Sequence, residues 1–288
     1  MDDQALSAPI AVLAPPRLES RRPSSRLRAG GAPRALALGA ASITAWLVAW
    51  QLASTYRLDF LFRFENVPAP TAVAHAAGQL LLTPKFAAHV LNSVRRVFVG
   101  FALAGVLATV LGLVIGRFRL ARESLLPPLE IMRPIPAVAW IPLAILLFAS
   151  PEHSMVFITF IGAFFPILLS TIHGVEGIDK RLVHASLTLG AGPLDVFLDV
   201  ILPGALPAIV TGLSIGMGTS WFSLVTAEMI SGQFGIGYYT WEAYTLQNYP
   251  AIVLGMISIG LLGMGSSLAI VVVGRRLMPW FKPLTRTA

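Results

Sequence analysis

Long hydrophobic runs, separated by short polar segments, dominate the pattern of this chain. The runs long enough to cross about 30 Å of hydrocarbon are 35–53, 97–116, 135–149, 155–175, 205–228 and 250–273. The run 135–149 is short and contains Pro136 and Pro142, so we expect its helix to begin near Leu129 and to be kinked. The pattern therefore predicts an all-α integral membrane protein with six transmembrane helices.

Two pairs of glycines inside these runs have the GxxxG spacing, Gly112 with Gly116 and Gly212 with Gly216. Such pairs allow two helices to approach closely in a membrane. The signal is weak, because glycine is common in membrane helices.

Composition agrees with the membrane assignment. Hydrophobic residues make up 56% of the chain and charged residues 12%, whereas soluble domains carry roughly 25% charged residues. The chain has no cysteine, which excludes disulfides, thiolate metal sites and cysteine nucleophiles. Its net charge of +7 does not indicate nucleic-acid binding, because the basic residues are scattered between the hydrophobic runs.

The distribution of Lys and Arg predicts the orientation in the membrane. With the N-terminus inside, 16 of the 21 basic residues fall in inner segments. The outer segments then hold Arg57, Arg63, Lys85, Arg95 and Arg96. Because basic residues gather on the cytoplasmic side, we expect both termini to be cytoplasmic. The run 35–53 is too long, and too far from the N-terminus, for a typical signal peptide, so we interpret it as an uncleaved first helix.

One polar loop, 176–204, is much longer than most other connections. Its apolar residues between 182 and 189 have amphipathic helical spacing, which predicts a short helix along the membrane surface. Gly190 is expected to cap this helix, and Pro203 and Pro207 to break and restart the chain before the next span. From these features alone, an interfacial helix and a docking site for a cytoplasmic partner are equally good readings.

The loop resembles the signature of bacterial ABC-importer permeases, which is an EAA triplet, three residues, Gly, nine residues, and I-x-L-P. The corresponding positions here are His184, Ala185, Ser186, Gly190, Leu202 and Pro203. The spacing from Gly to Pro is kept. His184 replaces the usual Glu, Ser186 the second Ala, and Val200 the Ile, so polar contacts attributed to that Glu are not carried over.

The resemblance extends over about residues 85–275 and identifies one branch of these permeases, for nitrate, taurine, aliphatic sulfonates and bicarbonate. Its four blocks are EIMRPIPAVAWIPLAILLF (130–148), FFPILLSTIHGVEGIDK (164–180), VILPGALPAIVTGL (200–213) and TAEMISGQFGIGYYTWEAY (226–244). The segment 231–249 is closer to nitrate-type members, and other stretches resemble the sulfonate type equally, so the anion stays open.

This resemblance implies a type I ABC-importer permease fold in a bacterial inner membrane. It implies a homodimer, two cytoplasmic ATP-binding subunits and a periplasmic solute-binding protein. The expected divisions are a disordered basic cytoplasmic tail (1–34), a first transmembrane helix with its periplasmic connection (35–84), a permease core (85–278) with the coupling loop, and a cytoplasmic tail (279–288). The chain has no G-x-x-x-x-G-K-[ST] motif, so ATP hydrolysis belongs to the partner and we expect neither enzymatic activity nor a cofactor.

Polar and charged residues within the spans are candidates for the translocation pathway, because burying them in a membrane is costly. They are Arg133, Ser220, Trp221, Ser223, Thr226 and Glu228. Each has a structural alternative. Anchoring at the inner surface is favoured for Arg133, and a cap or salt bridge for Glu228. For the polar side chains of 220–226, bonds between helices and contact with an anion are equally good explanations.

Two other functions compete with the permease interpretation. An ATP-independent secondary transporter or channel needs ionisable residues near the centres of its spans, and the charged residues found here, Arg133 and Glu228, lie near span ends. A membrane-embedded enzyme is disfavoured because the five histidines show no H-x-x-x-H or H-E-x-x-H spacing.

Overall fold

The computed structural model describes residues 31–57 and 66–281, which form helices and connecting turns without a β-strand. The predicted tail 1–34 lies outside the described residues as far as residue 30, and the predicted tail 279–288 lies outside them from residue 282. The chain divides into two compact units, residues 1–50 and 51–288. Helix α1 (Gly31–Thr55) begins in the first unit and covers the first predicted span.

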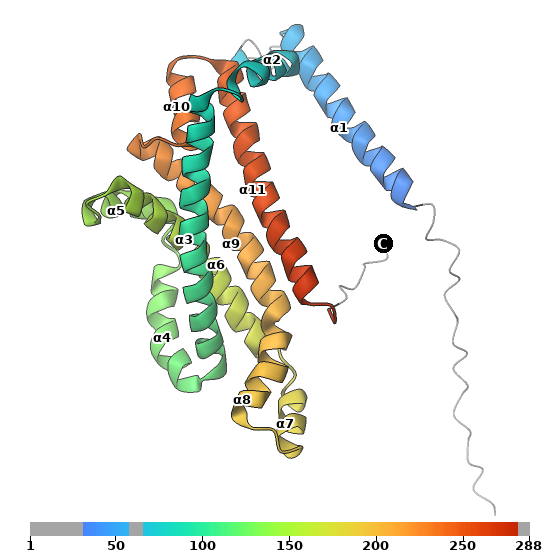
Figure 1. Cartoon of the computed structure of the whole chain (residues 1–288), viewed down its shortest axis with the longest axis vertical. Helices are drawn as coiled ribbons and strands as arrows, with labels where there is room; N and C mark the ends of the chain where they lie inside the picture. Colours follow the sequence, from blue (N-terminus) through green and yellow to red (C-terminus); the bar gives the residue numbers. More distant parts are fainter. Residues whose placement is uncertain (1–30, 58–65, 282–288) are drawn as a thin grey trace, which may run out of the picture. The chain divides into compact units, whose positions relative to one another are not determined.

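Four long helices build the second unit and lie side by side in Figure 1: α3 (Pro84–Arg117), α6 (Pro151–Glu176), α9 (Leu202–Ser231) and α11 (Tyr249–Leu277). Helix α6 packs against both α3 and α9, and α11 packs against α9. With α1, the described part of the chain has five helices long and apolar enough to cross a membrane, or six when a bent pair counts as one span. This agrees with the six predicted spans.

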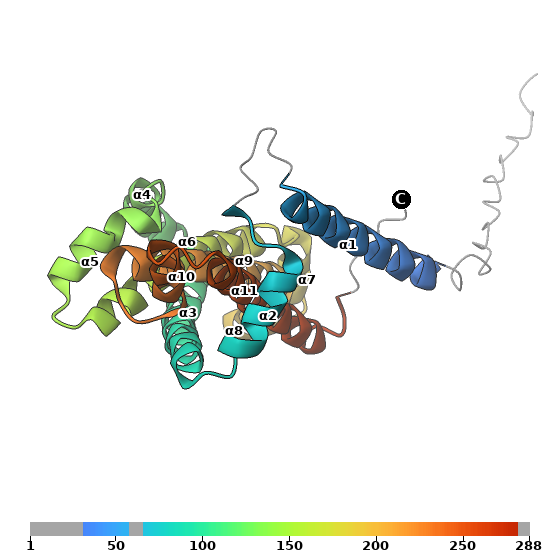
Figure 2. The same ribbon diagram turned by 90° about the horizontal axis from the view of Figure 1, so that it is seen from above.

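Short helices cover the two ends of this bundle. They are α2 (Pro70–Leu80) and α10 (Ile236–Thr245) at one end, and α7 (Lys180–Thr188), α8 (Pro193–Asp195) and the π-helix η4 (Val196–Ile201) at the other (Figure 1). Neither α2 nor α10 was expected from the hydrophobic pattern, because both are shorter than a span. Seen from above in Figure 2, α4 and α5 lie toward one side of the bundle and α11 and α2 toward the other.

The third predicted span is a broken helix rather than one kinked helix. Helix α4 (Arg119–Met132) ends where Pro134 and Pro136 follow, and a 3₁₀ turn, η3 (Ala137–Trp140), leads into α5 (Ile141–Leu147). The two halves meet at 84°. Pro127 and Pro128 lie inside α4, and Arg133 before Pro134 keeps helical dihedral angles (φ −55°, ψ −43°). The backbone is extended at Pro136, whose ψ is 142°, and neither Pro134 nor Pro136 has an N–H to continue the helical hydrogen bonds. Pro142 lies in the first turn of α5, where its missing N–H costs little.

Two other predicted boundaries also differ from the structure. Helix α3 begins at Pro84 rather than near residue 97, because Thr83 caps it by accepting a hydrogen bond from the Phe86 N–H (3.3 Å). Pro207 lies inside α9 and does not interrupt the helix, while Pro203 occupies the first turn of that helix. The restart predicted near these prolines is therefore wrong at Pro207.

Glycines allow α3 and α9 to lie close to α6. A Cβ on Gly112 of α3 would lie 2.6 Å from the Thr171 Cβ of α6, and one on Gly212 of α9 would lie 2.6 Å from the Ser170 Cβ. Gly116 and Gly216 face Val175 and Ile167 in the same way. Both GxxxG pairs therefore pack against α6 within the same chain.

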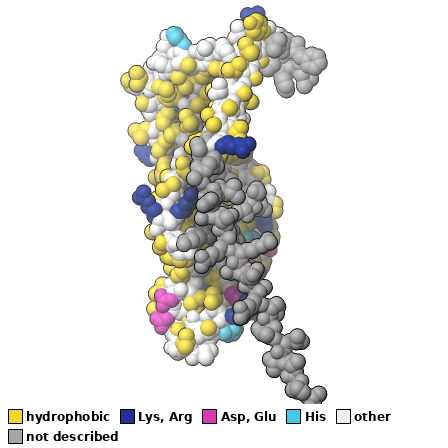
Figure 3. All heavy atoms as spheres, turned by 90° about the vertical axis from the view of Figure 1, so that its right-hand side faces the viewer, with side chains coloured by type: hydrophobic (Ala, Val, Ile, Leu, Met, Phe, Trp, Pro, Cys, Tyr) yellow, Lys and Arg dark blue, Asp and Glu magenta, His cyan; other side chains and the backbone are white. Residues whose placement is uncertain are grey.

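The outer surface of the described helices is strongly hydrophobic. In Figure 3, hydrophobic side chains extend along much of the length of the molecule, whereas acidic side chains gather near the end that carries α7 and α8. On α11, for example, the exposed large side chains include Met256, Leu261, Met264 and Leu268. A surface of this kind is stable against hydrocarbon rather than water.

We predict opposite effects for two glycine substitutions on α9. Gly212→Ala should lower the unfolding free energy by about 1–3 kcal/mol, because the new methyl overlaps Ser170 and the Ile167 backbone. Gly218→Ala, where nothing lies within 4 Å of the added Cβ, should leave stability unchanged or raise it slightly, since Ala favours helix. Thermal unfolding of the two purified variants in detergent measures the difference. Equal losses would contradict the packing described for α6 and α9.

Candidate functional site

The loop between α6 and α9 starts at a well-formed helix cap. The Asp179 carboxylate accepts a hydrogen bond from the backbone N–H of Arg181 (2.9 Å), and the Arg181 guanidinium donates to the same carboxylate. The side-chain bond from Arg181, with the backbone bond, lowers the pKa of the Asp179 carboxyl below its ordinary value. A negative charge is therefore kept at the N-terminus of α7, where the helix dipole favours it.

Gly190 ends α7 with a left-handed turn. Its φ is +88°, and its N–H donates to the Leu187 carbonyl (3.0 Å), while the N–H of Ala191 donates to the Ser186 carbonyl (3.1 Å). Nothing lies within 4 Å of a Cβ built on Gly190. Glycine is therefore favoured here by the backbone conformation and not by lack of space.

The second half of the loop returns the chain to the bundle. The Asp195 carboxylate accepts a hydrogen bond from the Gly192 N–H (2.9 Å) and so fixes the start of α8. The π-helix η4 then runs without a break into α9. Val196 and Ile201 are buried in a cluster with Val175 of α6, and Leu202 and Val183 pack against that cluster.

Helix α7 exposes its own apolar residues. None of its residues is buried in the described chain; Leu182 is 57% exposed and Leu187 48%, and the following Leu189 is 88% exposed. Of the residues that match the signature, His184, Ala185 and Gly190 are exposed, while the others are half-buried: Ser186, Leu202 and Pro203. The structure thus presents a short amphipathic helix, anchored at both ends, with its surface available to a partner.

A buried charge network lies toward the opposite end of the bundle. The Glu228 carboxylate of α9 is fully buried and accepts hydrogen bonds from the Arg96 guanidinium (2.9 Å), the Ser93 hydroxyl (2.8 and 2.9 Å) and the Gly237 N–H (2.9 Å). Arg96, which is 3% exposed, also binds Glu152 in the first turn of α6. One guanidinium therefore joins α3, α6 and α9.

The same network holds the segment between α9 and α10. Arg96 Nη1 donates to the Phe234 carbonyl (2.8 Å), and the Ile236 N–H donates to the Ser93 hydroxyl (2.8 Å). The His89 ring stacks on Phe234, with 3.6 Å between centroids, and its Nδ1 lies 2.9 Å from the Gly235 carbonyl. A Cβ on Gly235 would overlap the Glu228 carboxylate.

Sequence reasoning missed this network, because it assigned Arg96 to an outer connection. A signal was present, since His89, Ser93 and Arg96 have the spacing i, i+4 and i+7, which places three polar side chains on one helix face. For Glu228, the structure has the salt bridge that was favoured over contact with an anion.

The other candidate pathway residues of α9 contribute to packing. The Ser220 hydroxyl donates to the Thr159 carbonyl (3.3 Å), the Trp221 Nε1–H to the Ser266 hydroxyl (3.0 Å), and the Thr226 hydroxyl to the Phe222 carbonyl (2.8 Å). Ser223 is buried against Gly162 of α6.

Arg133, which follows α4 at the broken span, has an exposed side chain. In the described part of the chain, no carboxylate lies within 4.0 Å of its guanidinium.

The chain is similar in sequence to a family of membrane transport proteins. Residues 104–286 match the family model described as "Binding-protein-dependent transport system inner membrane component". The chain is 39% identical to a putative ABC transporter permease protein of Methanocaldococcus jannaschii, over 76% of this chain and 82% of that protein. It is 31% identical to the nitrate import permease protein NrtB of Leptolyngbya laminosa, over 93% and 98%.

The chain is also similar to a sulfonate permease in sequence and to a solved transporter in fold. The putative aliphatic sulfonates transport permease protein SsuC of Escherichia coli is 32% identical over 80% of this chain and 87% of that protein. A crystal structure of an amino acid ABC transporter with histidines matches with a TM-score of 0.54, covering 71% of this chain and 97% of that chain at 15% identity. At this identity the structural match establishes the fold alone.

We predict that breaking the buried ion pair destabilises the chain far more than breaking an exposed one. Glu228→Ala leaves the Arg96 guanidinium without one of its buried partners and should cost about 3–5 kcal/mol. Lys85→Ala breaks the pair with Glu242, in which the Lys85 side chain is 61% exposed, and should cost about 0–1 kcal/mol. Thermal unfolding of both purified variants tests this. Similar shifts for the two would show that the network is not a structural anchor.

Proposed function

This chain belongs to the inner membrane components of binding-protein-dependent transport systems, and from that membership we propose that it forms the translocation pathway for a small anion in an ATP-binding-cassette importer. The anion is of the nitrate, taurine, alkanesulfonate or bicarbonate class. Relatives named as nitrate and aliphatic sulfonate permeases support this class. The amphipathic helix α7 with its glycine turn, in the loop that resembles the family signature, is the observation that carries the proposal.

Membership in this family implies ATP-binding and substrate-binding partners. We propose that the functional unit contains two copies of this chain, two cytoplasmic ATP-binding subunits and one periplasmic binding protein, in a bacterial inner membrane. The excess of basic residues in the inner segments supports an orientation with both termini in the cytoplasm. The α7 end of the bundle then faces the ATP-binding subunits.

We assign α7 to coupling because an exposed, amphipathic helix fits a groove on a partner. Its exposed leucines, Leu182 and Leu187, offer apolar contacts, while Val183 ties the helix to the cluster at the end of α6 and α9. Movement of α7 would thus be transmitted to the two helices that pack most extensively against each other. A rigid-body shift of these helices could change which side of the membrane has access to the pathway.

Among the candidate pathway residues, Arg133 is the strongest for contact with the anion. An anion needs hydrogen-bond donors, and the donors of Ser220, Trp221 and Thr226 are already bound within the chain. The Arg133 guanidinium is exposed and has no carboxylate partner among the described residues. It lies at the break between α4 and η3, in the block EIMRPIPAVAW.

Reconstitution tests the proposed function. With the cognate ATP-binding subunit and the ligand-loaded binding protein in proteoliposomes, this chain should support anion-stimulated ATP hydrolysis and anion uptake. The chain alone should hydrolyse no ATP.

Arg133→Gln should keep basal hydrolysis and assembly but raise the anion concentration needed for half-maximal uptake by about tenfold, since one charge-assisted contact contributes on the order of 1.4 kcal/mol.

One outcome would contradict the permease function, and another would contradict only the role of Arg133. Uptake driven without the ATP-binding subunit would place the chain among secondary transporters or channels. Unchanged anion dependence in the Arg133 variant would remove Arg133 from the pathway while leaving the permease function intact.

The turn at Gly190 provides a test of coupling. Gly190→Val should reduce co-purification of the ATP-binding subunit and abolish uptake, because a β-branched residue is strained at φ +88°. Gly190→Asn is the matched control, since Asn has a similar size but tolerates the left-handed region, and it should keep most of both activities. Equal losses in the Val and Asn variants would show that the backbone conformation at Gly190 is not the cause, and full activity in both would show that this turn is not needed for coupling.

A further inference from the structure

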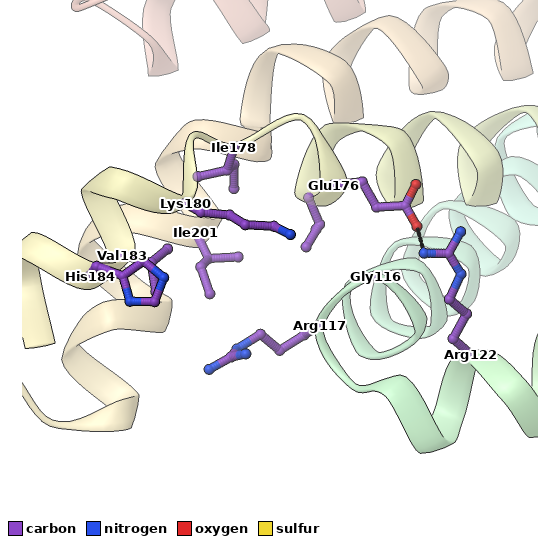
Figure 4. Close-up of a pocket in the computed structure, with 10 residues that line it drawn as sticks. Gly116, Arg117, Arg122, Glu176, Ile178, Lys180, Val183, His184 and Ile201 are labelled. Carbon is purple, nitrogen blue, oxygen red and sulfur yellow. Dashed lines mark ion pairs between the residues drawn. The ribbon is translucent and has the colours of Figure 1, made fainter.

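A cavity of about 510 Å³ opens beside α7 and is also lined by the last turns of α3 and α6, the start of α4 and the end of η4. Its wall carries four basic or imidazole side chains, Arg117, Arg122, Lys180 and His184, and one carboxylate, Glu176. In Figure 4, Lys180 extends from α7 toward the centre of the cavity, with Arg117 and His184 on the same side and Arg122 apart from them. Basic side chains from α3 and α7 therefore line the same cavity.

Only part of this charge is neutralised within the described chain. Arg122 Nη1 lies 2.5 Å from Glu176 Oε1, so these two charges form a salt bridge and neutralise each other. No described carboxylate lies within 4.0 Å of the Arg117 guanidinium or the Lys180 ammonium group. The cavity thus has two cationic groups without a partner among the described residues, together with an imidazole, and is complementary to an anion with several oxygens.

An apolar groove of about 430 Å³ begins at the same arginine. It is lined by Leu113, Val114 and Phe118 around the end of α3, and by Pro193, Leu194 and Phe197 of α8 and η4. Arg117 lines both spaces, and its Cζ lies 5.9 Å from the Phe118 ring centroid. Phe118 is 58% exposed and Leu194 66% exposed. An occupant of both spaces would need an anionic group joined to a hydrocarbon portion.

We propose that this composite site binds an anionic phospholipid of the cytoplasmic leaflet, with its phosphate in the basic cavity and one acyl chain in the groove. Helix α3 is one of the membrane-spanning helices, so its last turns lie where phospholipid head groups are found, and basic pockets at this depth suit anionic head groups. The groove distinguishes a lipid from a free phosphate, which has no hydrocarbon to bury.

The site connects the lipid to α7. Lys180 and His184 belong to α7, whereas Arg117 belongs to α3, so one phosphate would bridge the two helices. An occupied site would hold α7 against the bundle and make coupling depend on anionic lipid. The effect on coupling rests on the proposed function, whereas the lipid site requires only this chain in its proposed orientation.

The test uses the full-length chain purified in detergent, with phosphatidylglycerol, phosphatidylcholine and inorganic phosphate as probes, and native mass spectrometry to count bound molecules. The wild type should bind phosphatidylglycerol in preference to phosphatidylcholine. Arg117→Gln/Lys180→Gln should weaken phosphatidylglycerol binding by about 30-fold, because each basic residue near a lipid phosphate contributes about a factor of five. The single variant Lys180→Gln should weaken it by about fivefold.

The matched control is Arg119→Gln/Arg181→Gln, which removes the same charge from side chains that are both 91% exposed and paired with Glu123 and Asp179 outside the cavity. It should bind the lipid as the wild type does. Leu194→Ser, in the groove, should weaken lipid binding but leave any phosphate binding unchanged.

Equal losses in the two double variants would overturn the site, because binding would then follow net charge alone. If inorganic phosphate binds strongly and Leu194→Ser has no effect on lipid binding, the ligand of this site is a free anion and not a lipid. These measurements need neither ATP nor partner subunits, so a failure of the lipid site is distinguishable from a failure of the permease function.

Discussion

The close contact of α6 with α3 and α9 is the constraint on which the other features depend. It exists because Gly112 and Gly212 present no side chain where Thr171 and Ser170 of α6 approach. In a membrane, lipid tails are as apolar as leucine side chains, so helices associate through close packing and hydrogen bonds rather than by excluding water. The three helices form one body, and the elements at both ends of the bundle are placed by it.

Each end of this body carries a different polar structure. At one end, the Arg96 guanidinium of α3 donates hydrogen bonds to carboxylates of α6 and α9 and to a carbonyl of the segment that follows α9. Burying this charge is costly unless it is paired, so the pairing holds α3, α6 and α9 together. At the other end, Val183 of α7 packs against the apolar cluster formed by α6, η4 and α9, and none of the residues of α7 is buried by the described part of the chain. The first arrangement suits rigidity, and the second suits a partner.

This difference supports the division of labour that we propose. A permease that is driven by separate ATP-binding subunits needs an exposed element on the motor side and a stiff connection to the helices that line the pathway. The proposed lipid site lies next to that element, where Arg117 of α3 and Lys180 of α7 face one cavity. It would let the composition of the membrane influence the same movement.

The sequence by itself determined the membrane class, the number of spans and the position of the loop that resembles the family signature. Each depends on local patterns: hydrophobic length, Gly and Pro positions, and the spacing from Gly190 to Pro203. Only the tertiary structure decided the roles of Arg96 and Glu228, the 84° break after α4, and the cavity at Arg117. Arg96 is 132 residues from Glu228, and Arg117 is far in sequence from Lys180. A hydrophobic pattern reports the environment of each segment, whereas a charge network or a cavity depends on which distant segments pack together.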